Sequence, residues 1–211
     1  MLEVKSEQAS AAVPSTTIEK ITFEDFLIKY DGQHAEWIDG EVKIGMPAAD
    51  RHQDLCDFLV SILRFWVEAK NVGVIRSSPL AMKLIKERKG REPDVLFVSK
   101  KNLKRLKPTF LDGPADLVIE IISPESRARD RGDKFYEYEQ SGVREYWLID
   151  PERKQAEFYG LDANGIFQFL AIDADKKFRS RVLENLELNV EWLWQETLPP
   201  LIKVLKEWKL I

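Results

Sequence analysis

Apolar residues recur along the chain at both helical and strand-like spacing, which predicts a mixed α/β protein. The clearest helix lies over residues 50–69, where apolar side chains return every three or four positions on one face. A capping-box-like start at Thr22 predicts a short helix over residues 22–30. Two more helices are expected, over about residues 129–141 and over residues 201–211.

Short apolar runs between these helices predict strands. The runs at 94–98 and 115–122 are nearly continuous, which is typical of central strands covered on both faces. Asp39 and Gly40 separate two short runs and predict a β-hairpin, because a type I′ turn needs residues that tolerate positive φ. The other predicted strands cover residues 72–77, 80–85, 145–149, 156–160 and 166–172, the last two as a hairpin.

The order of these elements predicts one α/β domain over residues 21–211. No repeat and no Gly/Ser-rich or Pro-rich linker divides the chain, and 211 residues are within the range of one domain. Residues 1–20 are polar and aperiodic, so we expect a flexible leader there.

Composition excludes several classes of protein. Hydrophobic residues make up 44% of the chain and charged residues 32%, which excludes a collagen-like or largely disordered protein. No stretch approaches the roughly 20 apolar residues of a membrane span, and the N-terminus lacks the apolar core of a secretory signal. The single cysteine, Cys56, fits a reducing compartment. We therefore expect a cytoplasmic protein without a membrane partner. Three C-terminal tryptophans fit either the core or a homodimer interface: Trp192, Trp194 and Trp208.

Charge is unevenly distributed along the chain. The net charge of −4 gives no general attraction to nucleic acid. The segment 83–107, however, holds ten basic and three acidic residues. This segment is either a solvated surface or a site for phosphate groups. The sequence contains no Gly-rich phosphate loop, no G-x-S-x-G motif and no set of cysteines that could hold zinc.

Two carboxylates interrupt the predicted central strands. Glu120 shares a strand face with Val118 and Ile122, and Asp94 follows Pro93 at the start of another strand. An ionised carboxylate is costly to bury unless it is paired or binds a cation. Taken singly, Asp94 could cap a turn and Glu120 could pair with an arginine. On neighbouring strands, the two together suit a hard cation such as Mg²⁺.

The Pro93-Asp94 and Glu120 pair resembles the PD-(D/E)XK phosphodiesterase motif, although Ile122 stands where that motif has lysine. The surrounding sequence is similar to the Uma2 family of restriction-endonuclease-like proteins, over roughly residues 20–195. The residues that carry this similarity are Glu36-Trp-Ile-Asp-Gly-Glu41, His52, Glu120-Ile-Ile-Ser-Pro-Glu-Ser126, Arg129-Asp-Arg-Gly-Asp-Lys134, Tyr138 and Gly142-Val-Arg-Glu-Tyr-Trp-Leu-Ile-Asp-Pro151.

The resemblance implies a restriction-endonuclease-like core: a central mixed, curved β-sheet flanked by helices, with an N-terminal hairpin and a C-terminal hairpin plus helix. It implies Mg²⁺ or Mn²⁺ as cofactor and DNA as substrate. It also implies that the lysine of the motif has moved to Lys134, on the helix after the glutamate strand. Tyr138, one turn later, would lie on the same helical face.

These residues permit metal-dependent hydrolysis of a phosphodiester bond. Asp94, Glu120 and the backbone carbonyl of Ile121 would hold the cation. Lys134 would orient the attacking water or stabilise the developing negative charge. Two further residues have open roles. Glu36 is either an additional metal ligand or part of a hairpin salt bridge, and His52 is either adjacent to the site or an exposed or capping imidazole.

Basic residues that flank the acidic pair in sequence are predicted to contact the phosphate backbone of DNA, which would position a duplex without reading its bases. They are Lys100, Lys101, Lys104, Arg127, Arg129 and Arg131. The alternative is a catalytically silent nucleic-acid-binding or assembly module on a nuclease scaffold, which the net negative charge favours. For an active site, we expect Asp94, Glu120 and Lys134 to converge, and one carboxyl pKa to rise in the metal-free protein.

Overall fold

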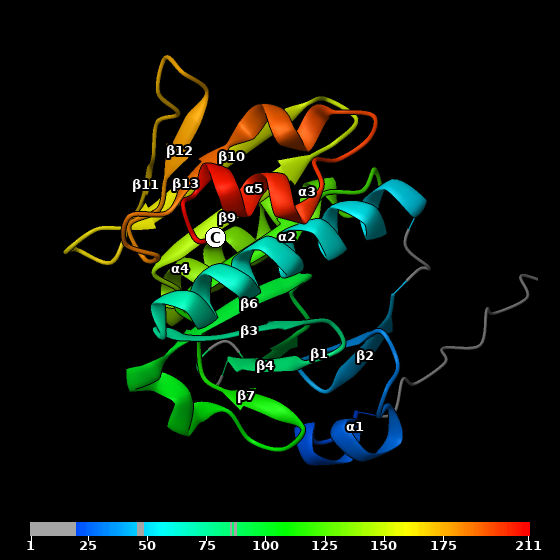
Figure 1. The fold of residues 1–211 in the computed structure, drawn as a ribbon. Coiled ribbons are helices and arrows are strands. Elements are labelled where there is room, and N and C mark those ends of the chain that lie inside the picture. The colour runs from blue at the N-terminus through cyan, green and yellow to red at the C-terminus, as the bar shows by residue number, and fades with distance from the viewer. Residues whose placement is uncertain (1–19, 46–48, 85, 87) are drawn as a thin grey trace, which may run out of the picture.

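The computed structural model describes residues 20–45, 49–84, 86 and 88–211. The predicted leader, apart from Lys20, lies outside the described residues. Over the described ranges the chain is a mixed α/β protein with two larger sheets and five α-helices (Figure 1). None of these helices combines the length and the apolar character that crossing a bilayer requires.

A six-stranded mixed sheet forms the centre of the fold, in the order β11-β10-β9-β8-β6-β3. Its strands are β3 (Gly73–Ser77), β6 (Val95–Ser99), β8 (Leu117–Ile121), β9 (Glu145–Asp150), β10 (Gln155–Leu161) and β11 (Phe167–Phe169). Strands β8 and β9 are parallel, and the other neighbours are antiparallel. The prediction that 94–98 and 115–122 are central strands is confirmed, because β6 and β8 are adjacent inside the sheet and every residue of β8 is buried.

A second sheet of five strands lies beside it, in the order β2-β1-β5-β4-β7. Its strands are β1 (Ala35–Ile38), β2 (Glu41–Ile44), β4 (Ala81–Leu84), β5 (Lys89–Arg91) and β7 (Phe110–Asp112), and a separate pair is formed by β12 (Lys177–Arg179) and β13 (Glu187–Asn189). The predicted hairpin is confirmed: Asp39 and Gly40 have φ values of 52° and 95° between β1 and β2. The three-residue strands β5, β7, β12 and β13 were not predicted from the sequence.

Helices cover the sheets and connect the strands. They are α1 (Phe23–Lys29), α2 (Asp50–Lys70), α3 (Arg127–Arg131), α4 (Asp133–Ser141) and α5 (Leu201–Glu207), with 3₁₀ turns η1 (Lys100–Arg105) and η2 (Val190–Trp194). The single helix expected over residues 129–141 is wrong in one respect, because Gly132, with φ −111° and ψ −93°, separates α3 from α4. The last helix is also shorter than expected and ends at Glu207.

The six-stranded sheet has a hydrophobic core on each face. Helix α2 lies across one face, where its apolar residues pack with Ile119 and Ile121 of β8 (Figure 1). Tyr138 of α4 belongs to the opposite core, with Val118 and Ile122. Successive residues of β8 therefore alternate between the two cores, which places Glu120 on the face of α4.

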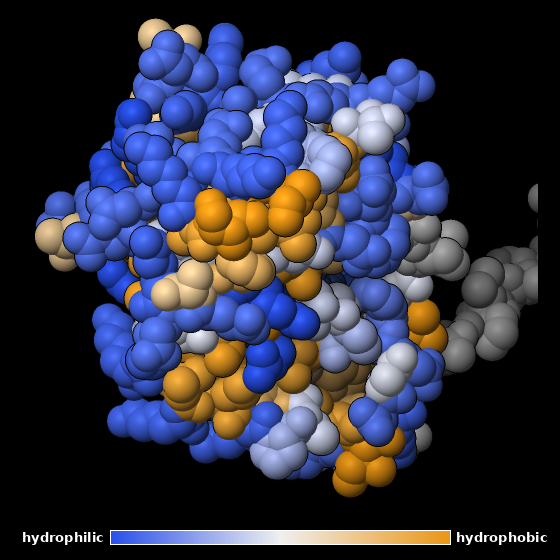
Figure 2. All heavy atoms as spheres, in the orientation of Figure 1, coloured by the Kyte–Doolittle hydropathy of each residue, from blue (hydrophilic) through white to orange (hydrophobic). Residues whose placement is uncertain are grey.

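The C-terminal segment closes the α2 core. Trp192 is buried there, and Trp194 and Trp208 pack against the same core, so the structure favours a core role for these tryptophans. Leu201 is 39% exposed, because it begins α5 one turn before the buried pair Val204 and Leu205. Figure 2 shows the resulting apolar patch over α5, to which Leu201 and the exposed Ile202 contribute.

Candidate active site

Asp94, which immediately precedes β6, lies opposite Glu120 of the adjacent antiparallel strand β8. Val95 pairs with Ile119, so the register continued by one residue sets Asp94 against Glu120. Directly opposed residues have Cβ atoms about 5 Å apart and point to the same face of a sheet. The Oδ2 atom of Asp94 also accepts a hydrogen bond of 2.7 Å from the backbone N–H of Ile121. The two carboxylates and the main chain of Ile121 therefore meet at one end of the β6–β8 pair.

His52, in the first turn of α2, lies beside Asp94. Its Nε2 atom is 3.2 Å from Asp94 Oδ2, and its side chain is only 19% exposed. Burial alone would lower the pKa of His52, but Asp94, the Glu120 carboxylate and the main chain of Ile121 outweigh burial and raise that pKa. The N-cap of α2 is Ala49, so His52 is not a capping residue and lies next to the acidic pair.

Lys134 reaches the same place from α4. Its ammonium lies 2.9 Å from Glu120 Oε1, 3.4 Å from Glu36 Oε1 and 3.3 Å from Asp130 Oδ1, and the residue is only 4% exposed. Although burial disfavours its charge, the surrounding carboxylates raise the pKa of Lys134, so it stays protonated at neutral pH. Lys134 is thus a fixed positive charge against Glu120, as the displaced-lysine interpretation required.

Glu120 is buried and contacts two donors of α4 through one oxygen, Oε1. The hydroxyl of Tyr138, one turn after Lys134, donates a 2.7 Å hydrogen bond to Glu120 Oε1. Burial, together with the charges of Asp130 and Asp94, outweighs Lys134 and raises the pKa of Glu120 to about 8. The expected rise of one carboxyl pKa therefore falls on Glu120. Burial also raises the pKa of Tyr138, which keeps its hydroxyl a donor.

Glu36, on β1, is part of this cluster and also of a salt bridge. Its Oε2 accepts a 2.8 Å hydrogen bond from Nη1 of Arg91, and its Oε1 faces Lys134. Burial would raise the pKa of Glu36, but the charges of Lys134, Arg91 and Arg129 outweigh it and hold that pKa at about 2. Arg91 in turn binds both oxygens of Glu137 on α4. Arg91 belongs to the basic segment 83–107, which was predicted to be a solvated surface or a site for phosphate groups, but it is buried and paired with carboxylates. No role at the site was predicted for Asp130 or Glu137.

The cluster contains more acidic than basic groups. The side chains that contact Lys134 and Arg91 are the carboxyl groups of Glu36, Glu120, Asp130 and Glu137. With Arg129, whose charge also lowers the pKa of Glu36, three cations face four carboxyl groups, and Glu120, with a pKa of about 8, is largely protonated at neutral pH. Asp130 Oδ1 is buried and lies 3.3 Å from the Lys134 ammonium, and among the described residues it has no hydrogen-bond partner. When Glu120 is ionised, the cluster has one more negative than positive group, which favours an added cation.

The donors next to this acidic cluster have the chemistry of a hard-cation site. Asp94, Glu120 and the main-chain carbonyl of Ile121 offer only oxygen atoms, which Mg²⁺ and Mn²⁺ accept. Within the described part of the chain, no group of three or more His, Cys, Asp and Glu side chains is arranged to hold a metal ion. Main-chain and water oxygens would have to complete the coordination of a cation held by Asp94 and Glu120.

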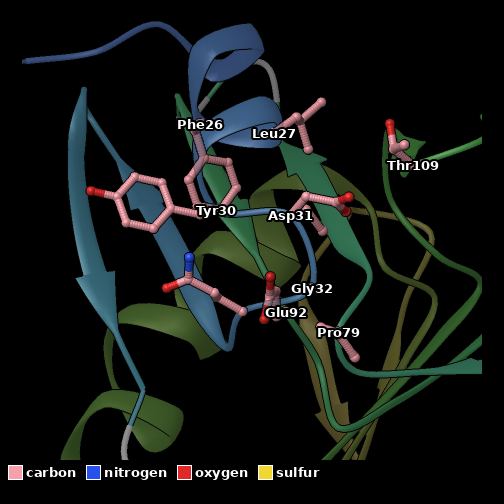
Figure 3. Close-up of a pocket in the computed structure, with 10 residues that line it drawn as sticks. Phe26, Leu27, Tyr30, Asp31, Gly32, Pro79, Glu92 and Thr109 are labelled. Atoms are coloured by element: carbon pink, nitrogen blue, oxygen red, sulfur yellow. The ribbon is translucent and has the colours of Figure 1, made fainter.

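A small surface recess lies close to the cluster, but its lining does not include Asp94, Glu120 or Lys134. It is formed by α1, the turn after it and residues around β4, and Figure 3 shows Glu92 next to Gly32 within it. Burial, with a contribution from Glu36, raises the pKa of Glu92 to about 7, although the Ala35 N–H bonds its Oε2 at 3.2 Å.

The three arginines of α3 are not equivalent. Arg127 binds Asp150 and Glu152, and Arg131 binds Glu157 with Nε and Nη2 at 2.9 and 2.6 Å. These pairs connect α3 to β9 and β10, so the guanidinium groups predicted to contact DNA are already occupied. Arg129 forms no ion pair among the described residues, and its Nε is buried without a hydrogen-bond partner there.

The predicted lysine cluster lies far from the acidic pair. Lys100, Lys101 and Lys104 are exposed on η1, which follows the C-terminal end of β6, whereas Asp94 precedes its N-terminal end. At roughly 3.3 Å per residue, this separates η1 from Asp94 by about 20 Å. The structure therefore does not bring these lysines into the site, and only an extended ligand could contact both.

Comparison with known proteins identifies the family of this chain. Residues 22–191 match the family described as "Uma2: Putative restriction endonuclease", which is most of the chain. The chain belongs to the Uma2 family. The matched range contains all of the predicted site residues, from Glu36 to Tyr138.

A solved structure shares the fold of this Uma2 chain. It is the crystal structure of a "putative nuclease belonging to DUF820" from Anabaena variabilis ATCC 29413, with a TM-score of 0.67 and 18% sequence identity. The similarity covers 82% of this chain and 97% of the other. A search of curated proteins finds no match.

Proposed function

We propose that this Uma2 protein is a Mg²⁺- or Mn²⁺-dependent endonuclease that hydrolyses phosphodiester bonds of DNA. The observation that carries the proposal is the contact of 2.9 Å between the Lys134 ammonium and Glu120, which lies opposite Asp94 on the neighbouring strand. An acidic pair with one fixed ammonium is the set that metal-assisted phosphoryl chemistry needs. We also propose that β6, β8 and α4 form the core of a restriction-endonuclease-like fold.

The chain's own residues have distinct roles in this proposal. Asp94, Glu120 and the Ile121 carbonyl would hold the cation. Glu36 would assist indirectly, by its contact with the Lys134 ammonium. When bound, the cation would polarise the scissile phosphate and lower the pKa of a bound water. Lys134 would hold its positive charge where the water attacks and negative charge develops. Tyr138 would keep Glu120 oriented by its hydrogen bond.

DNA contact is proposed for the surface cations without carboxylate partners. Lys100, Lys101 and Lys104 are exposed on η1, and Arg129 is a half-buried residue of α3 whose charge acts on Glu36 at the site. A duplex long enough to span about 20 Å would reach from the site to η1. Arg127 and Arg131 are left out of this surface, because carboxylates already bind them.

The direct test of the proposal is nicking of supercoiled plasmid by the purified protein. With Mn²⁺ or Mg²⁺ the protein should convert supercoiled DNA to open-circle and linear forms, and EDTA should stop the reaction. A protein that binds Mn²⁺ but leaves supercoiled, linear and single-stranded DNA intact would contradict the endonuclease proposal. That result would favour the catalytically silent module on a nuclease scaffold.

Metal affinity should depend on pH through Glu120. Its pKa of about 8 keeps the carboxyl protonated at lower pH, and a cation needs the ionised form. We therefore expect the Mn²⁺ affinity to rise up to about tenfold per pH unit between pH 6 and 8 and to level off above pH 8. Calorimetry at pH 7, in two buffers of different ionisation enthalpy, should detect release of about one proton. Equal affinities at pH 6 and pH 8 would contradict this assignment.

A further inference from the structure

Arg91 connects three elements beneath the candidate site. It ends β5 and is only 1% exposed. Its Nε and Nη2 atoms donate to the two oxygens of Glu137 on α4, at 2.7 and 2.8 Å. Its Nη1 donates to Glu36 on β1, at 2.8 Å. One planar guanidinium thus binds two carboxylates that come from different elements.

Both carboxylates act on the position of Lys134. Glu36 presents its other oxygen to the Lys134 ammonium at 3.4 Å. Glu137 lies three residues after Lys134 on the same helix, so the two share one face of α4. Arg91 therefore constrains Lys134 in two ways: it orients a carboxylate partner of the ammonium, and it anchors the helix that carries the ammonium.

The geometry of these contacts needs an arginine. The guanidinium fork matches the two oxygens of a carboxylate and leaves a third N–H for another acceptor, whereas a lysine offers one compact ammonium. Burying such an ion group is also a poor way to gain stability, because well-packed apolar residues are often as good or better. A buried, doubly paired arginine here is explained better by positioning than by stability.

We propose that Arg91 is a positioning residue that fixes the Lys134 ammonium against Glu120 through Glu36 and Glu137. Arg91 touches neither Asp94 nor Glu120 among the described residues, so it acts on the site only through Lys134 and its partners. The catalytic consequence rests on the proposed function. The placement of Lys134 does not, and it can be measured in the metal-free protein.

Three variants separate the contacts, and one matched variant serves as a control. Arg91→Lys keeps the positive charge but loses the planar guanidinium, and Arg91→Met removes both. Glu137→Gln weakens only the ion pair that connects Arg91 to α4. The control is Arg179→Met. Arg179 also binds two carboxylates, Glu187 and Asp173, each at 2.7 Å, but it is 59% exposed on β12 and contacts no residue of the site.

The first readout is the Nζ signal of Lys134 in ¹⁵N NMR spectra of the metal-free protein, assigned by its absence in Lys134→Met. A buried ammonium paired with three carboxylates should give an ordered signal. We expect this signal to shift and broaden in both Arg91 variants, to change less in Glu137→Gln, and to be unchanged in Arg179→Met. Circular dichroism identifies the variants that remain folded, and Glu137→Gln keeps the test decisive if Arg91→Met does not fold.

The second readout is the single-turnover rate of DNA nicking at saturating Mn²⁺. Displacement of a catalytic group by about 1 Å can cost about 100-fold in rate, so we expect losses of about 10- to 100-fold in the Arg91 variants. The Mn²⁺ affinity should change by less than about threefold, since Arg91 contacts neither Asp94 nor Glu120 among the described residues. A purely structural role would lower stability without this split between rate and metal affinity.

The outcomes distinguish the inference from the function on which it rests. Folded Arg91→Lys and Glu137→Gln variants with an unchanged Lys134 signal would overturn the positioning role, whatever the nicking activity. If the wild-type protein does not nick DNA but the Lys134 signal responds to the Arg91 variants, the endonuclease proposal fails and the positioning role stands.

Discussion

Asp94→Asn and Glu120→Gln should each lower Mn²⁺ affinity and the rate of DNA nicking by at least about 100-fold. Even residues that only orient metal ligands change affinity or activity by about 10- to 100-fold, and each of these substitutions would remove a proposed charged ligand itself. The Asn side chain can still accept the 2.7 Å hydrogen bond from the Ile121 N–H, so the strand end should keep its structure. The effect of Asp94→Asn is therefore expected on metal binding rather than on folding.

The fold contains a matched control for Asp94 at the other end of the same strand pair. Asp116 precedes β8 and accepts a 2.8 Å hydrogen bond from the Ser99 N–H at the end of β6, as Asp94 does for Ile121 at the end of β8. Asp116→Asn removes a buried carboxylate with the same structural contact, far from the site. Calorimetric titration with Mn²⁺ should show a loss only in Asp94→Asn, and equal affinity in both variants would contradict the metal site.

Lys134→Met should separate metal binding from rate. The ammonium contacts Glu120 Oε1 at 2.9 Å, so it competes with a cation for that carboxylate and repels the cation's charge. We expect Mn²⁺ affinity to stay the same or to increase. The single-turnover nicking rate should fall by about 100- to 1,000-fold, the usual cost of one group that stabilises charge in the transition state.

Lys177→Met is the matched control for Lys134→Met. Lys177 also contacts a carboxylate, Glu187 at 3.4 Å, but its side chain is 35% exposed and lies on β12. The Lys177→Met variant should keep the wild-type nicking rate and Mn²⁺ affinity. Loss of Mn²⁺ binding together with activity in a folded Lys134→Met variant would contradict the assigned role, because it would make Lys134 part of the metal site's structure.

The sequence predicted the elements that depend on local pattern. The apolar face of α2 has a period that only a helix explains, and the positive φ values at Asp39 and Gly40 follow from turn chemistry. It missed β5 and β7, because a three-residue strand such as Lys89-Gly90-Arg91 is stabilised by pairing with neighbours that are distant in sequence. It also missed the break at Gly132, where the composition around it still favours helix.

The candidate site was predictable where chemistry was visible within one element. A carboxylate in an apolar strand, such as Glu120, is conspicuous in sequence. Arg91 and Glu137 were not, because each looks like an ordinary surface charge until β5, β1 and α4 are brought together. The contact of Asp130 with Lys134 could have been predicted from one feature of the sequence, the i,i+4 spacing of the two residues in a predicted helix.

The basic residues show the opposite limit of sequence reasoning. Arg127 and Arg131 looked free for phosphate contact because their partners, Asp150 and Glu157, lie on strands more than 20 residues later in the chain. The lysines of η1 follow Asp94 closely in sequence, yet the length of β6 carries them to the other end of the sheet. Sequence proximity to a motif thus gives little information on spatial proximity when an extended strand intervenes.

The central claim is that Asp94 and Glu120 share a cation, and anomalous diffraction from crystals soaked in Mn²⁺ tests it most directly. The claim predicts one strong anomalous peak between the two side chains. The peak should lie within about 2.0–2.4 Å of one carboxylate oxygen of each residue and close to the Ile121 carbonyl. Crystals of Asp94→Asn should lack the peak, and crystals of Asp116→Asn should keep it. Anomalous density elsewhere on the protein, with none between Asp94 and Glu120, would contradict the account.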